Sequence, residues 1–383
     1  MRTPICDQLG IEFPIFAFSH CRDVVAAVTN AGGFGVLGAL AYEPERLEVE
    51  LNWIDEHVGG RPYGVDFAMP ANYVGKGGGN ESTVEALTAM IPAEHRQFIH
   101  RLLDEAGVPP MPEGVERVVK AAGLGVDAEG PGQMEVALAH PGVRMIVNAL
   151  GPPPAYVVQM AHERGLLVGA LAGSRQHAER NVNIGVDLIV AQGTEAGGHC
   201  GEISTMVLVP QIVDAVGDRV PVLAAGGIGD GRQMAAAMAL GAQGVWCGSV
   251  WLLTSEASET PEVVANLLAA SSADAIRSRV MTGKPARQLR TKWTAAWEQP
   301  DAPDAAADAA AGAAVRRGRR AVLPGPHQGL RREPGGADRR QHRHRSPGAP
   351  GGGRDGRAVD RDDGADERAD GTLIGPCCGG ATD

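Results

Sequence analysis

The sequence has no apolar run of about 18 residues, so it offers no candidate for a membrane-spanning helix. Its start, Met1–Asp7, lacks the charged and then apolar regions of a secretory signal peptide. Positive charge is also in deficit. The chain has 35 lysines and arginines but 46 aspartates and glutamates. The resulting formal net charge of -11 disfavours nucleic-acid binding. The six cysteines have no disulfide-framework spacing, so we expect free thiols and a cytoplasmic protein.

Several motifs of common enzyme classes are missing as well. There is no Gly-x-Ser-x-Gly nucleophile turn and no P-loop lysine motif. Two groups of ligand-type side chains occur, namely His20, Cys21 and Asp23, and His199, Cys200 and Glu202. Neither group has the paired Cys-x-x-Cys or His-Glu-x-x-His spacing of a metal site, so we expect no bound metal.

Short apolar runs alternate with helical patterns up to about residue 255. With 383 residues, 44% of them hydrophobic, the chain can bury a large core in one or two domains. Most of the runs are continuous rather than alternating, which is typical of parallel strands buried on both faces. The expected strands are Pro14–Phe18, Gly35–Leu37, Tyr63–Phe67, Arg144–Leu150, Leu166–Leu171, Val186–Ala191, Pro221–Ala225 and Gly244–Gly248.

The stretches between these strands predict helices. They are Arg22–Asn30, Pro44–His57, Ala155–Arg164, Ser174–Ile184, Gln211–Val216 and Gly231–Leu240. Eight strand–helix units in roughly 250 residues fit an α/β fold of the (β/α)8 TIM barrel type. An open, doubly wound sheet is the alternative.

The interval between the third and fourth expected strands is too long for one crossover connection. It contains three helix-like stretches: Glu81–Met90, Pro92–Ala106 and Val115–Ala122. We therefore predict a small helical insert that caps the carboxyl end of the barrel, where barrels carry their active sites. The expected domains are a barrel formed by residues 1–75 and 141–300, an insert of residues 76–140, and a tail of residues 301–383.

The tail differs in composition from the rest of the chain. Residues 301–383 contain no aromatic residue and no lysine, but 14 arginines, 13 acidic residues and only seven valines, leucines or isoleucines. Such a segment buries too little apolar area to offset its ordering entropy, so we expect disorder. The arginine-only bias also suggests translation of a GC-rich gene in the wrong reading frame after Asp304. An arginine-rich interaction tail is the functional alternative, although the acidic residues nearly cancel its charge.

The segment Ala191–Gly201 follows a buried apolar run and contains four glycines, a glutamine, a glutamate and a histidine. Glycines let the backbone approach a flat or anionic ligand closely. Gln192, at the end of its strand, can donate to and accept from a ring edge. His199 brings a titratable imidazole to the same loop, so we expect it to take part in small-molecule chemistry. The structural alternative is a tight turn at Gly197 and Gly198 that carries a surface histidine.

Two later strands also end in glycine. Pro221–Ala225 is followed by Gly226 and Gly227, with Asp230 as a candidate N-cap of the next helix. The last strand ends at Gly248 and Ser249. Barrels often bind phosphate with the loops after strands seven and eight, so the order of these motifs predicts a phosphate site. Ordinary turn glycines are the alternative.

Three polar residues lie at the ends of the first and third expected strands. Ser19 and His20 follow the first strand, and Asp66 ends the third. We expect Ser19 and His20 to face a substrate and Asp66 to face a cofactor, because ligands contact this end of a barrel. For His20, a hydrogen-bonded histidine at the rim is the structural alternative.

The motifs resemble those of the FMN-dependent nitronate monooxygenases, formerly called 2-nitropropane dioxygenases. The similarity runs from about Gly10 to Trp297, and the tail has no counterpart where family members continue with a final helical segment. The segments that carry the resemblance are Gln192–His199, Ala224–Ile228, Gly244–Ser249, Asn30–Gly35 and Thr282–Arg287.

The resemblance implies FMN as the cofactor. It places the FMN phosphate at Gly227 and at the turn formed by Trp246, Cys247, Gly248 and Ser249, with Gln192 and Gly197 near the flavin ring or ribityl chain. It places His199 beside the substrate, where a protonated imidazole stabilises a nitronate and a neutral one accepts the α-proton of a nitroalkane. Electrons then pass to FMN and on to O2.

The chain departs from the family pattern at two places. It has Phe16–Ser19 where members commonly carry Gln-Ala-Pro-Met, and Asp66 where many carry asparagine. A carboxylate beside a flavin needs a partner or a raised pKa. These departures leave FMN binding expected and the nitronate substrate open.

Nitronate oxidation by O2, giving a carbonyl compound and nitrite, is the first functional hypothesis. The alternatives are an FMN-dependent NAD(P)H reductase of enones or enoyl thioesters, a non-redox barrel for a phosphorylated ligand, and an inactive remnant. The expected partners are a small-molecule substrate and O2, without nucleic acid or membrane, and a homodimer is left open.

Overall fold

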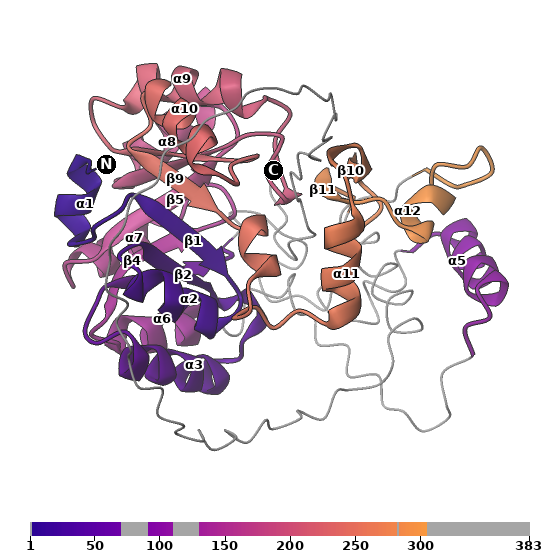
Figure 1. The fold of residues 1–383 in the computed structure, drawn as a ribbon, viewed down its shortest axis with the longest axis horizontal. Helices are drawn as coiled ribbons and strands as arrows, with labels where there is room; N and C mark the ends of the chain where they lie inside the picture. The colour runs from indigo at the N-terminus through magenta and orange to yellow at the C-terminus, as the bar shows by residue number, and fades with distance from the viewer. Residues whose placement is uncertain (1, 70–90, 110–129, 282, 305–383) are drawn as a thin grey trace, which may run out of the picture. The chain divides into compact units, whose positions relative to one another are not determined.

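A computed structural model describes residues 2–69, 91–109, 130–281 and 283–304. Eight strands form a closed barrel in the order β1-β2-β3-β4-β5-β6-β8-β9. All neighbouring strands are parallel, so the predicted (β/α)8 barrel is confirmed (Figure 1). The strands are β1 (Ile15–Ser19), β2 (Phe34–Gly38), β3 (Tyr63–Phe67), β4 (Val143–Asn148), β5 (Leu167–Ala172), β6 (Leu188–Gln192), β8 (Val222–Ala225) and β9 (Gly244–Cys247).

Helices follow the strands along the chain. The six helices predicted between the barrel strands are observed with closely similar ranges, except that α9 begins at Thr205 rather than Gln211; the helix Gly130–Ala139 was not predicted. The predicted helix begins after Pro210, since proline usually breaks a helix, but the buried Leu208 and Val209 hold the first turns of α9 in place. The helices are α2 (Arg22–Asn30), α3 (Pro44–His57), α6 (Gly130–Ala139), α7 (Ala155–His162), α8 (Arg175–Asn183), α9 (Thr205–Val216) and α10 (Gly231–Ala239).

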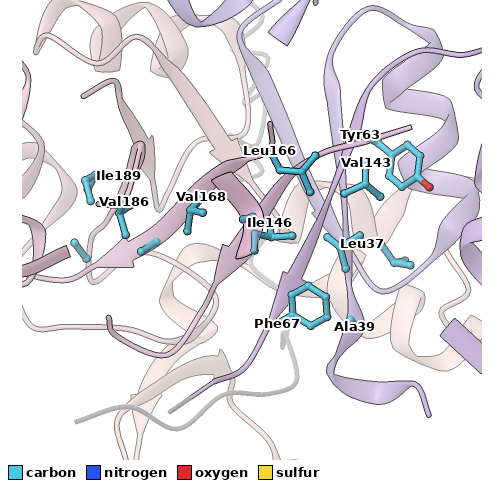
Figure 2. Close-up of a cluster of buried hydrophobic side chains, with 14 of the residues drawn as sticks. Leu37, Ala39, Tyr63, Phe67, Val143, Ile146, Leu166, Val168, Val186 and Ile189 are labelled. Atoms are coloured by element: carbon cyan, nitrogen blue, oxygen red, sulfur yellow. The ribbon is translucent and has the colours of Figure 1, made fainter. Parts of the chain in front are cut away.

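Alternate residues of most barrel strands enter two separate hydrophobic clusters. In β6, Ile189 and Ala191 pack in the outer cluster with α3, α7 and α9, whereas Leu188 and Val190 pack in the inner cluster. Figure 2 shows part of the outer cluster, with side chains from β2 through β6. A short helix, α1 (Pro4–Leu9), adds Ile5 to the inner cluster, and Thr3 Oγ1 bonds the carbonyl of Gln243, which precedes β9. The amino end of the barrel is therefore filled with apolar side chains.

The inward alternation continues to the carboxyl ends of the strands, where it places polar side chains. The side chain of Asp66 points into the barrel, because successive side chains of a strand alternate and its neighbours Val65 and Phe67 both pack in the outer cluster. Gln192 continues the inward series of Leu188 and Val190 in β6. These two polar groups are therefore directed toward the mouth of the barrel.

A second sheet has three antiparallel strands in the order β10-β11-β7. Its strands are β7 (Gly198–His199), β10 (Ala275–Ser278) and β11 (Ala286–Leu289). His199 lies opposite Ala286, and Gly198 lies opposite Arg287. Sequence patterns did not predict this sheet, which incorporates the histidine loop.

A satellite cluster joins α5 (Ala93–Glu105) to α12 (Lys292–Ala296). The rings of Phe98 and Trp297 meet edge to face at 4.8 Å, and Arg101 bonds Asp301 at 2.7 Å. The predicted helix Pro92–Ala106 is thus observed as α5, whereas the predictions for Glu81–Met90, Val115–Ala122 and the tail from residue 305 lie outside the described residues.

The remaining elements follow β2 and β9. They are η1 (Ala39–Ala41), η3 (Ser249–Leu253), α11 (Pro261–Ala269) and η4 (Ser272–Asp274). In the part of the chain that the structure describes, no helix is both long and apolar enough to cross a membrane.

Candidate functional site

The two glycine-rich strand ends are adjacent at the same end of the barrel. Ala225 of β8 is the register partner of Gln192 on one side and of Trp246 on the other. Because β6, β8 and β9 are parallel, the residues after them emerge together at the carboxyl end. The structure thus brings Gln192, Gly226–Gly227 and Gly248–Ser249 into one neighbourhood.

Gly226 and Gly227 adopt conformations that other residues rarely tolerate. Their φ angles are +110° and +71°. A Cβ atom on Gly226 would lie 2.8 Å from Thr205 Oγ1 and 2.9 Å from the nitrogen of Ala196. Within the described residues, the backbone N–H groups of Gly226–Gly227 and Gly248–Ser249 donate to no backbone carbonyl. These strand ends therefore offer amide donors to a ligand.

The amino end of α10 is satisfied by its own side chains. Asp230 accepts hydrogen bonds from the backbone N–H groups of Arg232 and Gln233, at 2.9 and 3.0 Å. Gln233 Oε1 in turn accepts from the N–H of Gly229 at 2.7 Å. The predicted N-cap is confirmed, and it leaves the glycine pairs at the strand ends as the donors for an anion.

The loop that leads to His199 packs directly on this glycine turn. The N–H of Gly193 donates to Ala225 O at 3.0 Å. The carboxylate of Glu195 accepts from both the N–H and the hydroxyl of Thr205, at 2.8 and 2.7 Å, at the start of α9. Ser204, the N-cap of α9, provides no side-chain bond there, so Glu195 supplies the acceptor and a favourable charge.

Arg287 holds the other side of the histidine loop. Its Nε donates to Thr194 O at 2.7 Å and its Nη1 donates to Ala275 O at 3.1 Å. The backbone of Cys200 also donates to Pro285 O at 3.4 Å. His199 therefore lies on a short strand that is fixed both to the barrel and to β11, not on a free surface turn.

Asp66 is a buried acid in the inner layer of the barrel. It is 4% exposed, and its register partners are Gly38 and Val147. Burial raises the pKa of its carboxyl well above the usual value, and the backbone N–H of Ala149 offsets only part of that rise. Its Oδ1 is buried and has no hydrogen-bond partner in the described part of the chain. Such an oxygen is a group that a ligand in the barrel mouth can satisfy.

Ser19 and His20 lie at the rim of the barrel and already make local contacts. Ser19 Oγ accepts from the N–H of Cys21 at 3.0 Å, and His20 Nδ1 is 3.0 Å from Gly38 O. The imidazole lies so close to Gly38 that a Cβ atom there would be 2.6 Å from it. The ring of Phe18 meets that of His20 edge to face at 5.1 Å. The His20 side chain is thus built into the wall of the mouth.

Trp246 and Cys247 point in opposite directions. Trp246 packs in the inner cluster, stacked 6.2 Å from Phe18, while Cys247 packs in the outer one. Burial raises the pKa of the Cys247 thiol to about 12, which keeps it protonated near neutral pH. Any contact of Cys247 with a ligand in the mouth is therefore a backbone contact.

Two further features lie apart from these strand ends. A groove of about 270 Å³ on the outer side of β1 is lined mainly by apolar residues such as Phe13, Val24 and Trp251. In the described residues, no group of three or more histidine, cysteine, aspartate or glutamate side chains could hold a metal ion. Cys6, Cys21, Cys200 and Cys247 are free thiols.

Sequence reasoning missed the support that Thr205 gives to the histidine loop. A useful signal was present, because Ser204 and Thr205 precede the apolar run of α9 as helix-starting residues commonly do. The hydrogen bonds between Thr205 and Glu195 could not be predicted from the sequence, since the two residues approach each other only when β6 and α9 pack together.

Comparison with known proteins agrees with this architecture. The family model described as "Nitronate monooxygenase" matches residues 2–330. A Mycobacterium tuberculosis protein named "Putative monooxygenase Rv1533" is 57% identical over 305 residues, covering 79% of this chain and 80% of that protein.

Two solved structures extend the comparison. Nitroalkane oxidase from Streptomyces ansochromogenes has 27% identity and a TM-score of 0.63, over 82% of this chain and 88% of that one. A variant of FabK from Thermotoga maritima has 25% identity and a TM-score of 0.57, over 82% of this chain and 90% of that one.

Proposed function

The chain belongs to the nitronate monooxygenase family and is an oxidoreductase, and from this premise we propose that it binds FMN and oxidises nitronates with O2. The products would be a carbonyl compound and nitrite. One observation carries the proposal: the donors of the Gly226–Gly227 turn, the Gln192 amide and the histidine loop share one end of the barrel.

The residues at this end suit the separate parts of a flavin nucleotide. The amides of Gly226–Gly227 and Gly248–Ser249 suit the phosphate, which needs several convergent donors. Gln192, with Gly197 on the same loop, suits the polar edge of the ring or the ribityl chain. Asp66 supports the same assignment, because its carboxyl, whose pKa burial raises, has a buried oxygen without a partner among the described residues that can exchange hydrogen bonds with a flavin.

FMN would supply the electron acceptor for the oxidation and would return its electrons to O2. The protein would bind and orient the substrate. His199 in its protonated form would hold the nitronate by charge, and in its neutral form would accept the α-proton of a nitroalkane. The contacts through Glu195 and Arg287 would keep the imidazole in place during these steps.

Purified protein tests the proposal directly. We expect a flavin absorption spectrum, release of FMN on denaturation, and oxygen consumption with propane-2-nitronate in an oxygen electrode. A colourless protein that takes up no added FMN would refute the cofactor assignment and would favour a non-redox ligand or an inactive barrel.

The likeness to FabK supports one second candidate, an FMN-dependent reductase of enones or enoyl thioesters that uses NAD(P)H. Both candidates need flavin, so colour does not separate them. Oxidation of NADPH that depends on an enoyl thioester, without turnover of nitronates, would favour the reductase. The opposite pattern would favour nitronate oxidation.

A further inference from the structure

Gln288 is a buried amide on the face of the small sheet that carries His199. It is 7% exposed, and its Nε2 is fully buried without a hydrogen-bond partner among the residues that the structure describes. A buried donor without an acceptor costs free energy, so a native protein rarely keeps one without a use. An apolar side chain, such as that of Ile276 directly opposite on β10, would fill this position without the desolvation cost of a buried amide.

The strand register places Gln288 and His199 on one side of the sheet. His199 is the partner of Ala286, and side chains of paired residues point to the same face. Gln288 is two residues further along β11 and therefore shares the face of Ala286. A diagonal pair of this kind is typically about 7–8 Å apart, which is enough for one small molecule to contact both side chains. Arg287 is on the opposite face, where it bonds Thr194.

The side chain between the two polar groups is small, and so is the one next to it on β10. Ala286 separates His199 from Gln288 along the sheet, and Ser278 lies across from Ala286 on β10. No bulky side chain therefore separates the imidazole from the amide on this face of the sheet.

We propose that the Gln288 amide binds one oxygen of the nitronate on the sheet face that it shares with His199. This inference rests on the proposed function. A nitronate carries its negative charge on two oxygens that only accept hydrogen bonds, and an amide N–H donates without titrating. Gln288 thus holds the anion at every pH, whereas His199 adds its charge only when protonated.

Gln288→Met tests the inference, because methionine keeps the length of the side chain and removes the donor. A lost hydrogen bond to a charged group should lower kcat/KM for propane-2-nitronate roughly 10- to 100-fold. Nitrite, an anion with the same pair of oxygens, should bind more weakly by a similar factor when followed through the flavin spectrum. FMN content should stay at the parent value, and the melting temperature should not fall, because the substitution removes a buried donor that has no acceptor.

Gln243→Met is the matched control. Gln243 also has a buried amide oxygen without a partner, but it precedes β9 beside Thr3 at the amino end of the barrel. Nitronate kinetics and nitrite binding should not change in this variant.

Gln288→Glu is the second variant and decides the matter if the methionine variant does not fold. A carboxyl at this position should weaken turnover of anionic propane-2-nitronate more than that of neutral 2-nitropropane. Parent-like kcat/KM and nitrite affinity in a flavin-loaded Gln288 variant would overturn this inference and leave the proposed function standing. A parent protein that never binds FMN would overturn the proposed function itself.

Discussion

The carboxylate of Glu195 accepts hydrogen bonds from both the backbone N–H and the hydroxyl of Thr205, at 2.8 and 2.7 Å. This contact ties the loop after β6 to the start of α9. Glu195 also lies against the glycine turn, since a Cβ atom on Gly227 would be 3.2 Å from Glu195 Cβ. The histidine loop and the proposed phosphate site therefore share one support.

Thr205→Val should weaken that support. It removes the hydroxyl bond and keeps the backbone bond, so we expect a loss of about 1–2 kcal/mol in the free energy of unfolding and weaker FMN binding. Urea denaturation and FMN titration measure the two effects. Thr260→Val is the control, because Thr260 caps α11 and should affect stability alone. Equal FMN affinity in parent and Thr205→Val would contradict the shared support.

His199→Ala should keep the flavin and lose turnover. The imidazole is proposed to act on the substrate, and loss of an acid–base group typically costs about 100- to 10,000-fold in rate. The absorption spectrum and oxygen-electrode kinetics check both halves of the expectation. His162→Ala, which removes a histidine from the outer layer where it pairs with Asp187, should leave kcat/KM unchanged. Parent-like turnover in His199→Ala would remove this residue from the mechanism.

Gly227→Asp should abolish FMN binding. The new side chain would meet Glu195 in a backbone conformation with φ +71°, and its charge would repel the phosphate. Gly165→Asp is a matched control, because Gly165 also has φ +71° but a Cβ atom there would have nothing within 4 Å. Released flavin, measured by fluorescence after gel filtration, distinguishes the variants. An unchanged spectrum in Gly227→Asp would argue against the phosphate assignment.

Asp66 should make the stability of the apoprotein fall as pH rises from the acid range. Its folded pKa is raised above the unfolded value near 3.8, so the native state holds a proton that the unfolded state releases. The free energy of unfolding therefore decreases with pH between the unfolded and the folded pKa and levels off above the folded pKa.

Asp66→Asn should remove this contribution, so the stability gained by the variant should grow as pH rises through that window. Urea denaturation of the apoprotein at a series of pH values measures the difference, and Asp23→Asn, which alters an exposed carboxyl, provides the control. A difference between Asp66→Asn and the parent that stays constant with pH would mean that folding does not raise the pKa of Asp66.

Tyr63→Phe should affect stability without affecting catalysis. The Tyr63 hydroxyl donates to Asp55 at 2.9 Å, and Asp55 also contacts His140 Nδ1 at 2.7 Å. Tyr63 begins β3, so this cluster lies at the amino end of the barrel, away from the proposed site. We expect a loss of about 1–2 kcal/mol in unfolding free energy. A change in kcat/KM at constant FMN content would show that the two ends of the barrel are coupled.

The barrel could be predicted because its signals are local. Runs such as Val186–Ala191 are short and continuously apolar, and helices such as Arg22–Asn30 and Pro44–His57 separate them at regular intervals. Glycines at the ends of two consecutive strands indicated the proposed phosphate site, because parallel strands in a barrel all end on one side.

The small sheet could not be predicted in this way. β7 has two residues, and β10 and β11 mix charged with apolar residues, so none has a recognisable period. Their pairing depends on segments distant in the chain, and only that pairing places Gln288 beside His199.

By itself the sequence determined the eight barrel strands, most of the helices between them and the glycine turns, because each depends on the order of neighbouring residues. The tertiary structure alone decided that Thr205 supports Glu195, that the Asp66 carboxyl is buried with a raised pKa, and that Gln288 shares a face with His199. These properties depend on burial and on contacts across the fold, which no stretch of neighbouring residues encodes.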